Sequence, residues 1–362
     1  MTNHSGRSLE IGIFDHIEKS SGSANIGELY RERIAYVKRA EELGFSGYHL
    51  AEHHCTPLSV VPSPALFLSA LATHTSRIRI GPMVFLLPFY NPLRLMLEVC
   101  MLDNMSDGRF EFGIGRGVHP YEHAYYGIPT LQSSEIFEEA LDVILKGFTV
   151  DQLKHKGTHF RFDGVPVADM RPVQKPYPGL WYGAVKESSV IYAAKRGLNI
   201  CTNGPVEMNK RAIDTYLETR DKYWKTADDL QPHIAVPKLA VQRFVFVGDD
   251  EAKAVETARR HYAVFLDNIN KLYSYYGLTD NKVVVPFDKA REAGVMIVGT
   301  GGQVSDILNS QVERSGCNYL MLNFTFGSLS GAESLDSISL FADCVMPTFA
   351  QARCGLEVLA GA

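Results

Sequence analysis

The sequence predicts an α/β fold, a single closed (β/α)8 barrel of parallel strands surrounded by helices. Short apolar strands alternate with helices along the chain, a pattern typical of parallel sheets with right-handed crossovers. About eight such strand-then-helix units follow one another, which fits a closed barrel better than an open sheet. No change of composition across the 362 residues marks a domain boundary. We therefore expect one barrel domain over residues 1–362.

The first half of the chain shows this alternation clearly. Residues 9–14 have the β-branched alternation of a strand, and residues 28–43 place apolar side chains at roughly helical spacing before Gly44 ends the helix. Pro64 stands in the first turn of the next helix, where proline is tolerated. The further predicted strands of this half are 48–51, 78–85 and 110–114, and the further helices are 64–74, 92–105 and 133–148.

The second half resumes the alternation after an irregular, proline-rich stretch at 150–179. We expect this stretch and the segment 271–300 to be insertions in loops of the barrel, and 271–300 to fold over its mouth as a lid. The predicted strands are 180–184, 199–201, 239–247 and 318–323, and the predicted helices are 188–196, 207–225, 250–270, 303–314 and 335–349.

Composition excludes several classes of protein. The formal net charge is −5, without clusters of Lys and Arg, so the chain is a poor binder of nucleic acid. It has no apolar run of the length that a membrane helix needs and no secretory signal at its start. The six cysteines never approach a CxxC spacing and are expected to be reduced thiols. A cytoplasmic enzyme is the expectation.

Polar residues concentrate where the predicted strands end, which is where a barrel of this kind builds its active site. These residues are Asp15 and His16, Glu52 to His54, Met83 to Pro88, Gly113 to Gly117 with His119, and Val185 to Ser189.

Glu52-His53-His54 is the most distinctive of these groups. Neighbouring side chains of a strand point to opposite sides, so at most two of the three share a direction. One imidazole is placed to act as acid or base beside a cofactor, because its pKa lies near 7. The alternative is structural, with Glu52 pairing with a histidine to hold a loop.

Two other groups indicate a bound anion. Gly113-x-Gly-x-Gly117 departs from the dinucleotide fingerprint at Val118, so we expect its glycines to let a ligand approach the backbone, with Arg116 as a cation for a phosphate. Val185 to Ser189 precedes a helix, whose amides, hydroxyls and ammonium form a phosphate site, unless the serines only cap the helix. Gly299 to Gly302 is a competing phosphate site.

A zinc site is considered and set aside. His119, Glu122 and His123 match the H-x-x-E-H pattern of inverted zinc peptidases, but Gly127 and Pro129 limit any helix to about two turns and no distal ligand is identified. His155 and His159 are expected on the solvated surface. We expect no metal.

Four segments together resemble the bacterial luciferase-like flavin monooxygenases, over roughly residues 9 to 350. Each segment is weak by itself, whereas their order and spacing are specific. They are Ala51 to His54, Gly81 to Pro88 with Asn91 and Pro92, Leu102 to Gly117, and Ser339 to Pro347.

This resemblance implies a TIM barrel that binds reduced FMN and uses O₂ to oxidise an organic substrate through a flavin C4a-hydroperoxide. His53 matches the catalytic histidine, and Met83 begins a pair with Val84 that often forms a non-prolyl cis peptide under the flavin ring. The phosphate-binding positions fall on Arg116, Val185, Lys186, Ser188 and Ser189. The resemblance therefore does not favour Gly299 to Gly302 as the phosphate site, and this segment is expected only to support a loop. It also implies a homodimer and, since no nicotinamide fingerprint exists, a separate NAD(P)H:flavin reductase that supplies FMNH₂.

The chain departs from the family at two positions. Gly115 stands where luciferase carries a reactive cysteine, and Val185-Lys186 replaces small polar residues and a proline. The apolar residues after strand three favour an uncharged substrate such as an aldehyde or ketone. The alternatives are an F420-dependent hydride-transfer enzyme of the same fold and a catalytically silent flavin-binding protein.

Overall fold

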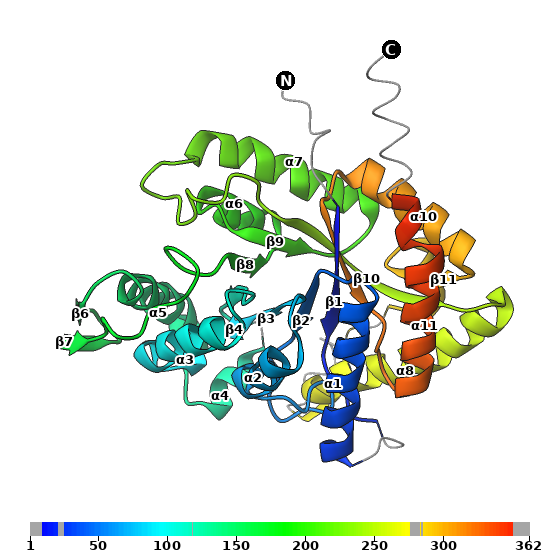
Figure 1. Ribbon diagram of the computed structural model, residues 1–362, viewed down its shortest axis with the longest axis horizontal. Helices are drawn as coiled ribbons and strands as arrows, with labels where there is room; N and C mark the ends of the chain where they lie inside the picture. Colours follow the sequence, from blue (N-terminus) through cyan, green and yellow to red (C-terminus); the bar gives the residue numbers. More distant parts are fainter. Residues whose placement is uncertain (1–8, 21–24, 118, 276–282, 284, 350–362) are drawn as a thin grey trace.

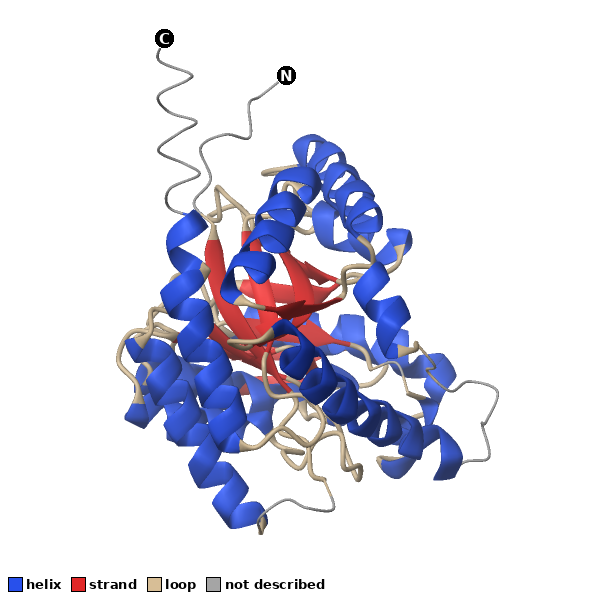
Figure 2. Cartoon of the chain, turned by 90° about the vertical axis from the view of Figure 1, so that its right-hand side faces the viewer, coloured by secondary structure: helices blue, strands red, loops and turns tan. Residues whose placement is uncertain are grey.

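Parallel strands form a nearly closed barrel with helices around it. The computed structural model describes residues 9–20, 25–117, 119–275, 283 and 285–349. In Figures 1 and 2 the strands gather in the centre and the helices lie outside them. The strand order is β3-β2-β1-β12-β10-β9-β8-β5-β4, and every pairing in this sheet is parallel. A parallel bridge between Ile80 of β3 and Phe110, just before β5, brings the two ends of the sheet together and nearly closes the barrel.

The strands of the barrel are short and almost entirely buried. They are β1 (Glu10–Asp15), β2 (Gly47–Leu50), β3 (Arg79–Pro82), β4 (Phe85–Leu86), β5 (Phe112–Gly115), β8 (Leu180–Gly183), β9 (Asn199–Thr202), β10 (Leu239–Val247) and β12 (Tyr319–Asn323). A further strand, β11 (Met296–Gly299), pairs with the end of β10. The nearly closed parallel sheet confirms the predicted barrel fold.

The helices follow the strands in the predicted alternation. They are α1 (Ile26–Glu42), α2 (Pro64–His74), α3 (Pro92–Met105), α4 (Pro120–Tyr125), α5 (Ser133–Gly147), α6 (Glu187–Lys195), α7 (Val206–Tyr223), α8 (Glu251–Tyr275), α9 (Phe287–Glu292), α10 (Gly301–Ser315) and α11 (Gly331–Cys344). Among the residues that the structure describes, no helix combines the length and the apolar character needed to cross a bilayer.

The structure differs from the prediction in both insertions. The segment 150–179 is not wholly irregular, because β6 (Gln152–Lys156) and β7 (Arg161–Pro166) pair as an antiparallel hairpin. The segment 271–300 contains α9 and β11, while residues 276–282 and 284 of the predicted lid lie outside the described residues. Short strands next to glycine and proline give a weak periodic signal, which is why both were missed.

Two predicted elements have different limits. The strand predicted at 78–85 is divided into β3 and β4 by a cis peptide between Met83 and Val84, as the resemblance implied. Helix α11 begins at Gly331 rather than at 335, because Ser330 and Glu333 form a capping box. Reciprocal capping of this kind starts a helix before its apolar face begins.

A buried polar network fills the amino end of the barrel. His49 on β2 contacts the Tyr319 hydroxyl at 2.9 Å, and Glu111 contacts Arg79 and Lys238 at 2.6 and 2.9 Å. Tyr319 fits because the facing residues are glycines: a Cβ at Gly12 would lie 2.0 Å from its hydroxyl oxygen. The network supports the barrel from the end opposite the predicted site.

The network makes stability depend on pH. Burial lowers the pKa of His49 from 6.5 to about 4, although Glu111 acts in the opposite sense. Between pH 6.5 and 4 the His49 side chain therefore binds a proton in the unfolded chain but stays neutral in the folded chain. We expect the free energy of unfolding to fall as the pH falls through this window, by about 1.4 kcal/mol per pH unit for this group. Urea unfolding at several pH values, compared between the wild type and His49→Gln, measures it; equal slopes would contradict the assignment.

Candidate active site

A cavity of about 340 Å³ opens at the carboxyl ends of the strands, where the sequence predicts the site. Its apolar wall includes Phe14, Ala51, Met83, Val84 and Leu86. Its polar lining includes Glu52, His53, Arg116, His119, Glu122, Lys186 and Ser189. The barrel thus brings together residues from the ends of six strands, β1, β2, β3, β4, β5 and β8.

The three residues after β2 divide between structure and cavity. Glu52 is buried, and its carboxylate contacts His54 Nε2 at 2.8 Å and accepts from the Tyr90 hydroxyl at 2.9 Å. Burial raises the pKa of Glu52 in spite of these hydrogen bonds. His53 also lines the cavity, with its side chain 17% exposed and its imidazole not bound to Glu52. The structural interpretation therefore applies to Glu52 and His54, which pair with each other, and the interpretation as acid or base applies to His53.

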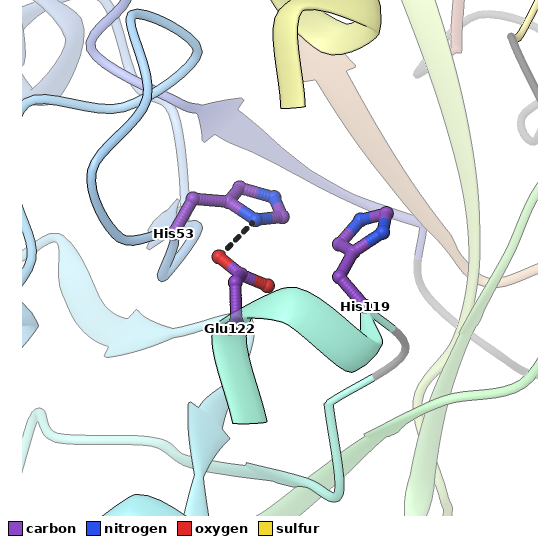
Figure 3. Close-up of side chains that lie close together, drawn as sticks. All are labelled: His53, His119 and Glu122. Carbon is purple, nitrogen blue, oxygen red and sulfur yellow. Dashed lines mark hydrogen bonds and ion pairs between the residues drawn. The ribbon is translucent and has the colours of Figure 1, made fainter. Parts of the chain in front are cut away.

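Glu122 on the short helix α4 is the partner of His53. Its Oε1 lies 3.3 Å from His53 Nδ1 and accepts the backbone N–H of His54 at 2.9 Å (Figure 3). Burial alone would favour the protonated acid, but the hydrogen bonds from His53 and His54 lower the pKa of Glu122. Because an ionised carboxylate only accepts, Nδ1 of His53 is the donor, and Nε2 is the nitrogen left for a ligand.

Other aromatic rings surround His53. His16, which follows β1, stacks on it with ring centroids 5.8 Å apart. Burial lowers the pKa of His16 to about 3 and that of His119 to about 4, so both rings are neutral at pH 7. His119 stacks on Tyr121 at 5.2 Å, and Tyr273 of α8 meets it edge-on at 5.6 Å. His16, His119 and Tyr121 are themselves buried, so His53 has packed rings beside it.

Cationic and hydroxyl groups lie at another part of the wall. Arg116, which follows β5, donates to the Ser134 hydroxyl at 2.8 Å while lining the cavity. Lys186 is the N-cap residue of α6, and Ser189 lies in the first turn, where its own N–H donates to the Lys186 carbonyl oxygen at 2.9 Å. The amides that precede it in this turn have no partner within the helix. Val185 also lines the cavity and is 45% exposed. Ser188 is exposed and is not among the described lining residues.

Gly115 leaves no room for a side chain. A Cβ added there would lie 2.3 Å from Val84 Cγ2, so a cysteine at this position would require Val84 to move. The packing around the Met83–Val84 cis peptide therefore agrees with a glycine at position 115, where luciferase has a cysteine.

The remaining sequence candidates lie elsewhere. His123 contacts the carbonyl oxygen of Arg116 at 3.1 Å and packs against Phe89, so it does not join His119 as the H-x-x-E-H pattern requires. Thr300, within the segment Gly299 to Gly302, caps α10. His155 and His159 are not solvated as expected: both are half-buried, and His155 pairs with Glu139 at 3.0 Å.

Comparison with known proteins identifies the class. The model of the luciferase-like monooxygenase family matches residues 9–318, and the chain belongs to this family. Monooxygenases are oxidoreductases, and the cavity of this barrel, which is lined by a histidine, a carboxylate and cationic side chains, agrees with that class.

Similar proteins cover most of the chain. An uncharacterised protein, y4wF, of Sinorhizobium fredii is 34% identical over 89% of this chain and 92% of its own. The oxygenase component of the flavin-dependent trigonelline monooxygenase of Acinetobacter baylyi is 26% identical, over 74% of this chain and 71% of its own. The oxygenating constituent of 3,6-diketocamphane monooxygenase from Pseudomonas putida, solved with FMN, has a TM-score of 0.79 at 20% identity, covering 94% of this chain and 98% of that one. The last similarity shows the fold alone.

Proposed function

We propose that this protein is the oxygenase component of a two-component flavin-dependent monooxygenase, which uses reduced FMN and O₂ to oxidise a small uncharged organic substrate. The observation that carries the proposal is the placement of His53 in the same cavity as Arg116, Lys186 and Ser189. The descriptions of the trigonelline and diketocamphane enzymes, an oxygenase component and an FMN complex, support it.

The residues of the cavity fit FMN. Met83, Val84 and Leu86 offer an apolar surface for a flat ring, and the cis peptide joins the first two. Arg116, Lys186 and the amides of α6 match the charge of a phosphate. Gly183 borders open space, since a Cβ there would meet nothing within 4 Å. When bound, reduced FMN supplies the two electrons that the reaction of O₂ with an organic substrate requires.

The residues of the chain have separate roles in this proposal. His53 holds or moves a proton at Nε2, and Glu122 orients it through Nδ1. His16, His119 and Tyr121 exclude water from the cavity, and the reaction of a reduced flavin with O₂ requires this exclusion. We expect a separate NAD(P)H:flavin reductase as partner and a homodimer in the cytoplasm, as the resemblance implies.

Cofactor titration tests the proposal directly. FMN and F420, each oxidised and reduced, are titrated into the purified protein, and O₂ uptake is then measured. We expect reduced FMN to bind and to support O₂ uptake. Anaerobic turnover with reduced F420 would establish the hydride-transfer alternative, and flavin binding without turnover by any substrate would leave a silent binding protein.

The variant Glu122→Gln tests the role of Glu122 as a positioning residue. The amide keeps the shape of the side chain but not its charge, so a charge-assisted hydrogen bond to His53 becomes a neutral one. We therefore expect oxygenation to fall about 5- to 10-fold with FMN affinity unchanged. The same change in a His53→Ala background should have little further effect. An equal loss in both backgrounds would show that Glu122 does not act through His53.

A further inference from the structure

Three potential metal ligands meet in the cavity from two segments of the chain. His53 follows β2, whereas Glu122 lies on α4 and His119 caps that helix (Figure 3). One ligand atom from each side chain lies within 4.8 Å of the other two. Within the described part of the chain, this is the one such group of three or more His, Cys, Asp or Glu side chains.

The spacing is close to that of a zinc site. Zinc bonds of 2.0–2.2 Å in a tetrahedron place ligand atoms roughly 3.3–3.5 Å apart. His53 Nδ1 and Glu122 Oε1 are already 3.3 Å apart. The rings of His53 and His119 are tilted by 50° with centroids 5.7 Å apart, so they are not stacked on each other. Since the three ligand atoms lie within 4.8 Å of one another, side-chain adjustments that shorten the longest separation by at most about 1.5 Å complete the set.

Contacts outside the group hold the ligands in place. Glu122 Oε1 also accepts the backbone N–H of His54 at 2.9 Å. His119 packs between Tyr121 and Tyr273. Outer contacts of this kind orient metal ligands and raise affinity.

We propose that His53, His119 and Glu122 bind one divalent transition-metal ion in the flavin-free protein, and that the ion inhibits oxygenation. Two imidazoles and a carboxylate with an open fourth position are a ligand set that Zn²⁺ accepts. The ion takes the place of the proton on His53 Nδ1, and this proton moves to Nε2, because a neutral imidazole that binds a metal through one nitrogen carries its proton on the other. Nε2 of His53 then cannot accept a proton, so the residue is lost as a base. Metal binding stands on this geometry alone, whereas the inhibition rests on the proposed function.

The site differs from the one that the sequence pattern offered. The H-x-x-E-H spacing pairs His119 with His123, but the ring of His123 is held at the Arg116 carbonyl. His53, distant in sequence, takes its place. His123→Gln is therefore a matched control, since the amide can keep the hydrogen bond to that carbonyl.

Zinc titration of the flavin-free, chelator-treated protein is the main test. We expect calorimetry with ZnSO₄ and metal analysis to give one ion per chain. Affinity should fall about tenfold or more in His119→Ala and stay unchanged in His123→Gln. No binding, or equal binding in wild type and His119→Ala, would overturn the site.

Cobalt gives a readout that needs no variant. In the wild type, Co²⁺ should show the intense visible bands of a four-coordinate ion, and only the faint bands of a hydrated six-coordinate ion would overturn the proposal. Zinc should also suppress O₂ uptake with reduced FMN. If the metal-free enzyme shows no O₂ uptake, only the proposed function is contradicted. If zinc binds but does not suppress the uptake, the proposed inhibition is overturned.

Discussion

Replacing His53 by alanine is expected to lower the rate of substrate oxygenation by about 10²-fold or more, which is the scale of a positioned acid or base. His53 is the histidine after β2 whose side chain enters the cavity, and Glu122 holds its Nδ1. Removing it should leave the fold intact, because the ring is partly exposed and its neighbour His54 keeps the contacts with Glu52 and Tyr126. Product formation and hydrogen peroxide release, measured together under reduced FMN, separate lost oxygenation from lost cofactor reaction.

His155→Ala is the matched control for this prediction. His155 lies on the hairpin of β6 and β7, outside the barrel sheet, and its pairing is with Glu139. Its loss should leave oxygenation unchanged. Unchanged turnover in His53→Ala, with folding confirmed by circular dichroism, would remove His53 from the mechanism.

Arg116→Ala should weaken binding of FMN about tenfold or more, while binding of riboflavin changes little. The reason is that a charge-assisted hydrogen bond contributes about 1.5–3 kcal/mol and riboflavin has no phosphate to accept it. Arg116 follows β5 and lines the cavity, where its only competing hydrogen bond among the described residues is to the neutral hydroxyl of Ser134. Fluorescence titration with both flavins measures the difference.

Arg94→Ala serves as the control for charge. Arg94 lies on α3 with its side chain 81% exposed and pairs with Glu98, so its loss removes one positive charge away from the cavity. FMN affinity should not change. Equal weakening of FMN and riboflavin by Arg116→Ala would contradict a phosphate role for Arg116.

The fold was largely predictable because its signal is local. Apolar periodicity and helix-ending glycines located the eight predicted strands, each of which overlaps a strand of the sheet. The hairpin of β6 and β7 and the short strand β11 escaped, because strands of four to six residues beside glycine and proline carry little periodic signal.

The sequence predicted where the site lies but not which of its side chains contact one another. The binding and catalytic residues that the resemblance implied and that line one cavity in the structure are His53, Met83, Arg116, Val185, Lys186 and Ser189. Alternation along a strand indicated only that at most two of Glu52, His53 and His54 share a direction, and it was the resemblance that singled out His53. Glu122 was noticed only as part of a zinc pattern, and no local feature showed that it would contact His53.

The sequence by itself determined the order of strands and helices and the edge of the barrel at which chemistry gathers, since both follow from short-range periodicity. The tertiary structure decided which side chains meet there. Glu122 lies 69 residues from His53, and Tyr273 reaches His119 from α8. Such contacts depend on barrel closure and on the path of each loop, which periodicity over a few residues does not contain.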